Sequence, residues 1–308
     1  MIEPNPKKIE NRARFASQNL TRRLAYGLLF GFLVFLIMVL VGDLRQISSQ
    51  LLSFRWSFLP LIIGLTFVNY ILRFFKWHFY LTQIGIRSLS YTESARLFVA
   101  GFPLAVTPGK VGEALKGLWL KKKVGIPAAR GVSVVLAERI SDGLGVLALS
   151  TLGVIAYPQY WPVFAVVLFA LVSVIVLSQI RPLALSLIHI GERLPVISRF
   201  AHLLQEFYEG SFALFRPRAT FIAVSLGIVS WFAEGVGMYI ILIGLGLPPS
   251  GELLSIAVFI LSFSTVIGAI SALPGGLGAT EVSVTGMLVL LLGLGTGIAT
   301  AATLLVRL

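Results

Sequence analysis

Long stretches of this chain carry no basic residue and almost no acid, and this feature constrains the fold most. The 38 residues between Asp142 and Arg181 have no formal charge, and residues 219–306 contain three acids but no Lys or Arg. A helix needs about 20 apolar residues to cross a bilayer. Only 12% of the residues are charged, whereas a water-soluble domain has about a quarter. The sequence therefore predicts an all-α, polytopic membrane protein and excludes a secreted disulfide scaffold, a disordered chain and an ordinary cytosolic enzyme.

The positions of the basic residues predict the topology. Six precede the uncharged run 24–42, ten lie in 73–130 and five lie in 181–218. Cytoplasmic loops of membrane proteins carry an excess of Lys and Arg. We therefore expect residues 1–23 to be a cytoplasmic basic segment and 24–308 to form one membrane-embedded domain. The net charge of +12 then follows the topology, and nucleic acid is not an expected partner.

Counting the apolar stretches predicts about six to eight transmembrane helices. Spans without a Pro-Gly break are expected at 24–42, 54–75, 131–156, 162–180 and 219–246. The basic stretch 181–218 repeats apolar residues at helical spacing, which predicts an amphipathic helix on the cytoplasmic surface. The repeated residues are Ile197, Phe200, Leu203, Leu204 and Phe207.

Two further apolar stretches are interrupted by Pro-Gly motifs and predict re-entrant or broken helices. The stretch 97–107 has 11 uncharged residues, too few to cross, so we expect it to enter and leave on the cytoplasmic side. The stretch 253–273 either spans or enters from the outer face and breaks inside the membrane. The two breaks share a Pro-Gly motif followed by an acid. If the second stretch enters from the outer face, the two breaks have opposite orientation, which is the pattern of inverted repeats in secondary transporters. Their residues are Pro108, Gly109, Lys110, Gly112 and Glu113 in the first, and Pro274, Gly275, Gly276, Gly278 and Glu281 in the second.

Four motifs in this order resemble the flippase-like family, also called the lysylphosphatidylglycerol synthase transmembrane region. They are Asn69-Tyr-Ile-Leu-Arg73-Phe-Phe-Lys76-Trp77, the two Pro-Gly motifs, and Glu138-Arg139-Ile-Ser-Asp142 between them. The resemblance covers nearly the whole chain after residue 20. It implies a lipid-translocating domain in the inner, cytoplasmic membrane of a bacterium or archaeon.

In multiple peptide resistance factor, a domain of this family precedes a soluble aminoacyl-transferase domain. The 308 residues contain no counterpart of that domain, so we expect no synthase activity from them. The last expected span ends near Leu308, and we expect proteins of this family to continue beyond their last span.

Three motif residues near the end of the second expected span predict a cationic cluster at phosphate depth. Asn69, Arg73 and Lys76 are spaced i, i+4 and i+7, which places them on one helix face. Snorkelling of long basic side chains is the alternative, above all for Lys76.

The first Pro-Gly motif predicts an anion site. Pro108, Gly109 and Gly112 break one helix and begin another, which leaves free backbone N–H groups, and Lys110 adds charge. The alternatives are a plain turn and a surface ion pair of Glu113 with Lys116. A nucleotide-binding loop is excluded because Val111 occupies the position that requires Ser or Thr.

The motif Glu138, Arg139 and Asp142 lies near the cytoplasmic start of a span. An Arg139–Asp142 pair would stabilise the protein without a role in transport, and Glu138 would then need a cation or a proton.

Glu234 and Glu281 lie in the half of the chain that lacks Lys and Arg. We expect each to be protonated, exposed to water, or paired with a base from the first half such as Lys110 or Arg139.

These residues predict a flippase that moves an anionic or aminoacylated phospholipid, or a polyprenyl-phosphate-type lipid, between leaflets. Membrane lipids are the expected partners, and a homo-oligomer or an envelope-biosynthesis partner is left open. One alternative is a lipid-modifying transferase with Glu113, Glu138 or Glu281 as general base; another is an accessory protein of envelope assembly. The chain has no cysteine, and its three histidines lack metal-ligand spacing, so no metal, cofactor or catalytic residue is predicted.

Overall fold

The computed structural model describes residues 44–107, 112–154, 157–191 and 200–307, together with positions 29, 33 and 198. Residues 1–23 and all but two residues of the expected span 24–42 lie outside this part of the chain. Within the described ranges every regular element is a helix, which confirms the all-α prediction.

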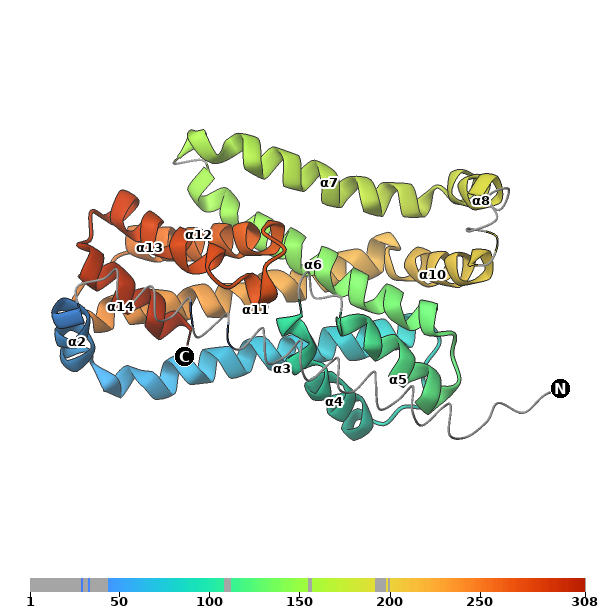
Figure 1. Ribbon diagram of the computed structural model, residues 1–308, viewed down its shortest axis with the longest axis horizontal. Coiled ribbons are helices and arrows are strands. Elements are labelled where there is room, and N and C mark those ends of the chain that lie inside the picture. The colour runs from blue at the N-terminus through green and yellow to red at the C-terminus, as the bar shows by residue number, and fades with distance from the viewer. Residues whose placement is uncertain are drawn as a thin grey trace.

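Four long helices run roughly along the longest axis of the molecule (Figure 1). They are α3 (Leu59–Gln83), α6 (Ala128–Val154), α7 (Trp161–Gln179) and α11 (Pro217–Gly244). A proline in the first turn begins α3, α7 and α11, where its missing N–H costs no helical hydrogen bond. The expected spans 54–75, 131–156, 162–180 and 219–246 are recovered within a few residues, except that α3 continues past residue 75 to Gln83. Arg73 and Lys76 are therefore inside a helix rather than at its end.

Shorter helices occupy the two ends of this bundle (Figure 1). At one end, which we call the basic end, lie α5 (Leu115–Val124), α8 (Arg181–Gly191) and α10 (Ala201–Leu214). At the opposite end lie α2 (Leu44–Ser53) and the short turn η4 (Pro158–Tyr160). The stretch 181–218, in which an amphipathic helix is expected, contains α8 and α10. Phe200, Leu203 and Leu204, three of the apolar residues on which that prediction depends, are exposed at the start of α10.

Five described helices are long and apolar enough to cross a membrane, and α6 has the length but carries charges in its interior. The protein is therefore a multi-pass membrane protein. The five are Trp56–Gln83, Pro158–Gln179, Pro217–Gly244, Gly251–Ile270 and Pro274–Leu292, of which the first includes η1 (Trp56–Phe58).

Two broken hairpins meet inside the bundle. The first consists of α4 (Tyr91–Ala100), η2 (Phe102–Val106) and α5, and the second of α12 (Gly251–Ile270), η5 (Pro274–Gly276) and α13 (Ala279–Leu292). The turn at η5 contacts η2 and lies near the middle of the long axis, away from the basic end (Figure 1). The break of the second stretch therefore lies within the bundle, and α12 by itself has the length and apolar composition to cross a membrane. Helix α14 (Thr296–Val306) then packs against α13 and α2.

The sharp turn at η5 depends on glycine. Gly275, Gly276 and Gly278 have φ angles of 61°, 69° and 86°. Residues other than glycine rarely adopt a positive φ of this size. Their spacing brings α13 back against α12, with Glu281 in its first turn.

Two apolar cores lie on either side of the charged residues. One joins α6, α11, α12, α13 and α14, and the other joins the later half of α3 with α4, α5 and α6. Asp142 of α6 lies between Ile140, in the second core, and Val146, in the first. The candidate site is thus at the junction of the two cores.

Candidate functional site

Asp142 is the centre of a buried ion-pair cluster between α3 and α6. Its carboxylate pairs with Lys76, with Arg73 Nη2 at 3.5 Å and with Arg139 Nη2 at 3.8 Å. Lys76 is 1% exposed, so its amine stays inside the protein, and the snorkelling alternative is wrong. The i, i+4, i+7 spacing did place Asn69, Arg73 and Lys76 on one face, and that face meets other helices.

Two more pairs extend the cluster towards α5. Lys116 Nζ lies 3.4 Å from Glu138 Oε2, and Glu113 Oε2 lies 3.5 Å from Arg139 Nε. The Lys116 amine also lies 4.9 Å from the ring centroid of Trp77, a distance at which a cation is attracted to the ring face. The alternative of a surface pair between Glu113 and Lys116 is wrong, because both side chains are buried and have different partners.

With all groups ionised, the cluster has a surplus of one positive charge. Its members are Arg73, Lys76, Lys116 and Arg139 against Glu113, Glu138 and Asp142. The expected Arg139–Asp142 pair is present, but Asp142 also holds two cations of α3. Glu138 has Lys116 as the cation that the sequence required.

A polar seam continues from this cluster along α3 and α11. Asn69 Nδ2 donates a hydrogen bond to the backbone oxygen of Ser230 at 2.9 Å. One turn further from the basic end, Thr66 Oγ1 donates to Glu234 Oε2 at 3.5 Å. Polar groups inside a membrane protein need such partners, so these contacts fix the register of α3 on α11.

Glu281 occupies the first turn of α13 and has two partners. Its Oε2 accepts a hydrogen bond from the backbone N–H of Gly278 at 2.7 Å, and its Oε1 lies 2.7 Å from Arg307 Nε. The first contact caps α13, and the second neutralises the carboxylate. The partner, Arg307, is a base near the end of the described chain. The sequence suggested a base from the first half, such as Lys110 or Arg139, as one alternative. Arg139 pairs with Glu113 and Asp142 instead, and Lys110 lies outside the described residues.

A cavity of about 660 Å³ brings charged residues of both halves together. One part of its wall is charged: Arg139, Asp142, Glu234, Glu281 and Arg307. Another part is apolar and includes Val167, Leu171 and Val174 of α7. Gly275 and Gly276 of η5 also line it, so the second broken helix forms part of the cavity.

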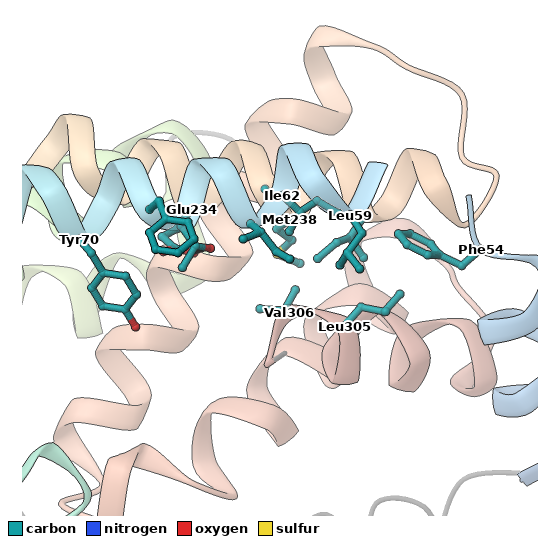
Figure 2. A pocket seen from close by; sticks show the side chains of 13 residues that line it. Phe54, Leu59, Ile62, Tyr70, Glu234, Met238, Leu305 and Val306 are labelled. Carbon is teal, nitrogen blue, oxygen red and sulfur yellow. Dashed lines mark hydrogen bonds between the residues drawn. The ribbon is translucent and has the colours of Figure 1, made fainter. Parts of the chain in front are cut away.

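A second cavity, of about 420 Å³, lies between α3 and α11. Its wall is almost wholly apolar, with Phe54 at one end and Glu234 and Tyr70 at the other (Figure 2). Leu305 and Val306 of α14 close one side. Glu234 and Val306 line both cavities.

Ion pairs at the basic end differ from the buried cluster in exposure. Lys123 Nζ lies 2.6 Å from Glu93 Oε1, and both side chains are exposed to more than a third. The ammonium of Lys123, together with the Ser90 hydroxyl, lowers the pKa of the Glu93 carboxyl below its ordinary value. This pair joins α4 to α5 outside the cavity.

The first Pro-Gly motif is placed only in part. Pro108, Gly109 and Lys110 lie outside the described residues. Gly112 donates its backbone N–H to Thr107 Oγ1 at 2.8 Å, and Glu113 reaches Arg139. In the ranges that the structure covers, no three His, Asp or Glu side chains converge as metal ligands.

Sequence reasoning missed five residues of the site. The sequence suggested Lys116 only as a surface partner of Glu113, and nothing in the sequence singled out Arg307. Thr66, Trp77 and Trp231 carry no charge, so only their spacing could have indicated that they belong to the site. Thr66 and Trp77 lie on the same helix as Asn69. Trp231 precedes Glu234 by one helical turn. Arg73 Cζ lies 6.0 Å from the Trp231 ring.

These features define a multi-pass α-helical membrane protein with a charged cavity beside the break of its second hairpin. The chain matches the family described as Lysylphosphatidylglycerol synthase TM region over residues 25–308, and it belongs to that family.

Two archaeal relatives are both called UPF0104 membrane proteins. That of Methanothermobacter thermautotrophicus is 26% identical over 277 residues, which cover 83% of this chain and 80% of the relative. That of Methanocaldococcus jannaschii is 25% identical over 179 residues, which cover 58% of this chain and 74% of the relative. No solved structure matches the chain significantly.

Proposed function

We propose that this protein moves a lipid with a phosphate head group between the two leaflets of the cytoplasmic membrane. The lipid is an anionic or aminoacylated phospholipid, or a polyprenyl phosphate. The observation that carries the proposal is the 660 Å³ cavity, whose wall is charged in one part and apolar in another. A lipid has the same two parts.

The charged part of the wall supports capture of a phosphate. The surplus positive charge of the cluster favours an anion, and arginine presents several N–H donors to phosphate oxygens. Among the described residues the Nε atom of Arg73 makes no hydrogen bond, and that of Arg139 has only the 3.5 Å ion-pair contact with Glu113. Arg139 lines the cavity, so its guanidinium is the first group we expect a head group to contact.

The apolar part of the wall supports passage of acyl chains. Val167, Leu171 and Val174 come from α7, a helix that stands apart from the rest of the bundle over much of its length (Figure 1). Most of the surface of α7 is exposed on the protein, where lipid would cover it. Acyl chains can therefore stay in lipid while the head group occupies the charged wall.

The proposed orientation places the basic end in the cytoplasm. Lys121, Lys122 and Lys123 end α5 and are exposed there, and Arg181 and Arg216 lie at the same end. An excess of Lys and Arg is typical of the cytoplasmic side. The N-terminal basic segment is assigned to the same side on its charge.

Leaflet exchange in liposomes tests the proposal. Purified protein is reconstituted with fluorescent phosphatidylglycerol, lysyl-phosphatidylglycerol or phosphatidylcholine, and a membrane-impermeant reductant reports the fraction of label in the outer leaflet. We expect exchange of at least one anionic or aminoacylated lipid and its loss in Arg139→Gln.

Arg130→Gln is the matched control. It removes the same type of side chain from the same helix, but Arg130 pairs with Glu206 at the basic end, outside the cavity. We expect this variant to retain exchange. Equal exchange by wild type and Arg139→Gln, or no exchange of any head group including a polyprenyl phosphate, would overturn the proposal.

A further inference from the structure

Glu234 differs from the other acids of the larger cavity in having no basic partner among the described residues. Asp142 and Glu281 both form ion pairs. The hydrogen bond that Glu234 accepts comes from the Thr66 hydroxyl and is 3.5 Å long. A carboxylate inside a membrane protein is neutralised by a cation, by a proton or by water. No cation of the described residues lies within ion-pair distance of Glu234, and the apolar helix around it offers few polar groups.

The two cavities offer this one carboxyl group two different environments. In the larger cavity it shares the wall with Arg139 and Arg307, which favour the ionised form. In the smaller cavity the other polar side chains of the wall are Thr66 and Tyr70 (Figure 2). An ionised acid is costly against such a wall, whereas a protonated acid is not. The ionised carboxylate of Glu234 is therefore more stable facing the larger cavity, and the protonated acid can face the smaller one.

Charged and titratable groups on the surrounding helices decide which form prevails. Arg73, the basic group on the facing helix α3, is paired with Asp142 and lies over Trp231. Helix α12 contributes no charged residue to either cavity. The groups that face this region are Tyr70 and Arg73 on α3, Arg139 and Asp142 on α6, Glu281 on α13, and Arg307 beyond α14.

We propose that Glu234 is a proton-binding site and that an anionic head group in the larger cavity promotes protonation. The head group would occupy the N–H donors of Arg139, which lines that cavity, and add negative charge beside Glu234, and both effects favour the neutral acid. By linkage, the proton favours binding of the head group to the same extent. An anionic lipid would then move together with one proton, which couples transport to a proton gradient. The proton site stands independently, whereas the coupling rests on the proposed function.

Infrared difference spectroscopy measures the protonation state of Glu234 without a transport assay. The protein is titrated in vesicles of phosphatidylcholine and in vesicles that also contain phosphatidylglycerol. We expect a protonated-carboxyl band that titrates with pH in wild type and is absent in Glu234→Gln. Glu252→Gln is the control, because it removes an exposed acid from the first turn of α12, and it should retain the band.

The lipid comparison tests the coupling. We expect phosphatidylglycerol to raise the proton affinity of Glu234 by about fivefold or more, the lower range of typical coupling between sites. Absence of a Glu234 band over the whole titration would overturn the proton site. Identical titrations in the two vesicles would overturn the coupling.

Failure of the proposed function gives a different result: the band titrates, but no lipid exchanges between leaflets. If Glu234→Gln does not fold, Thr66→Val replaces it. That variant keeps the shape of the side chain but removes the hydroxyl that donates to Glu234, so the band should shift and the proton affinity should rise.

Discussion

Lys76 on α3 and Asp142 on α6 form an ion pair in the protein interior, although 66 residues separate them in the sequence. Their exposed fractions are 1% and 5%. The pair joins two long helices at the junction of the two apolar cores. A buried pair is not by itself evidence of high stability, but removal of one partner leaves an uncompensated charge.

Asp142→Asn should therefore destabilise the protein strongly. It removes the shared acid of Lys76, Arg73 and Arg139, and we expect a loss of about 3–5 kcal/mol in the free energy of unfolding. Lys76→Met should cost less, because Asp142 keeps Arg73 and Arg139 as partners. Chemical unfolding in detergent micelles, followed by helical circular dichroism, measures both.

Glu93→Gln is the control for the loss of an ion pair. The Glu93–Lys123 pair is short but exposed, and exposed pairs contribute little to stability. The variant should unfold nearly as wild type does at neutral pH. A larger loss in Lys76→Met than in Asp142→Asn would contradict the assignment of Asp142 as the shared acid.

Two substitutions of Glu281 should separate its capping role from its charge. Glutamine can still accept the hydrogen bond from the Gly278 N–H, whereas alanine cannot, so Glu281→Ala should be less stable than Glu281→Gln by about 1 kcal/mol. Both variants remove the charge that faces Arg307 in the cavity. On the proposed function, both should therefore lose lipid exchange.

Ser250→Ala provides a matched loss of a cap outside the cavity. The Ser250 hydroxyl accepts a hydrogen bond from the N–H of Leu253 at 3.0 Å and caps α12. This variant should lose about 1 kcal/mol but retain exchange. Loss of exchange in Ser250→Ala would show that transport follows stability rather than the charge of Glu281.

The crossing of α6 and α11 should not tolerate a side chain at Gly145. A Cβ atom there would lie 2.9 Å from the backbone carbon of Gly227, so the two helices would have to separate. We expect Gly145→Ala to cost about 1–3 kcal/mol, the range for overpacked sites. Thermal unfolding in detergent measures the loss.

Gly237→Ala is the control on α11. A Cβ at Gly237 would meet no atom within 4 Å, and alanine favours a helix over glycine by about 1 kcal/mol. This variant should be at least as stable as wild type. A similar loss in both variants would mean that the helix crossing is not as close as the structure shows.

The described spans could be predicted from the sequence because each is a mostly apolar run of membrane length with few charged residues inside it. The face shared by Asn69, Arg73 and Lys76 was also predictable, since it depends on the helical period alone. The partners of these residues were not predictable. Whether Lys76 snorkels or is buried depends on where α6 passes, and α6 lies about 60 residues later in the chain.

Long-range packing likewise decided the site residues that sequence reasoning missed. Lys116 follows a break and precedes three lysines, so its position in the chain suggested a surface residue. The first hairpin instead inserts it between Glu138 and the ring of Trp77. No local pattern distinguishes Lys116 from Lys121, because burial here results from how the hairpin packs.

The absence of cysteine in the chain makes the topology directly testable. Single cysteines are introduced at three exposed positions, Pro249 before α12, Thr296 at the start of α14, and Lys122 at the basic end. We expect a membrane-impermeant thiol reagent to label Pro249→Cys and Thr296→Cys from one side and Lys122→Cys from the other. The reason is that α12 and α13 form a hairpin whose two ends lie together (Figure 1).

A fourth cysteine distinguishes a broken hairpin from two complete spans. Leu273→Cys lies at the turn between α12 and α13 and lines the larger cavity. If η5 lies inside the bundle against η2, this cysteine should react much more slowly than Lys122→Cys from the basic side. Equal rates from that side would show that α12 and α13 both cross the membrane. The proposed inverted arrangement of the two breaks would then be wrong, because the second turn would open on the same side as α4 and α5.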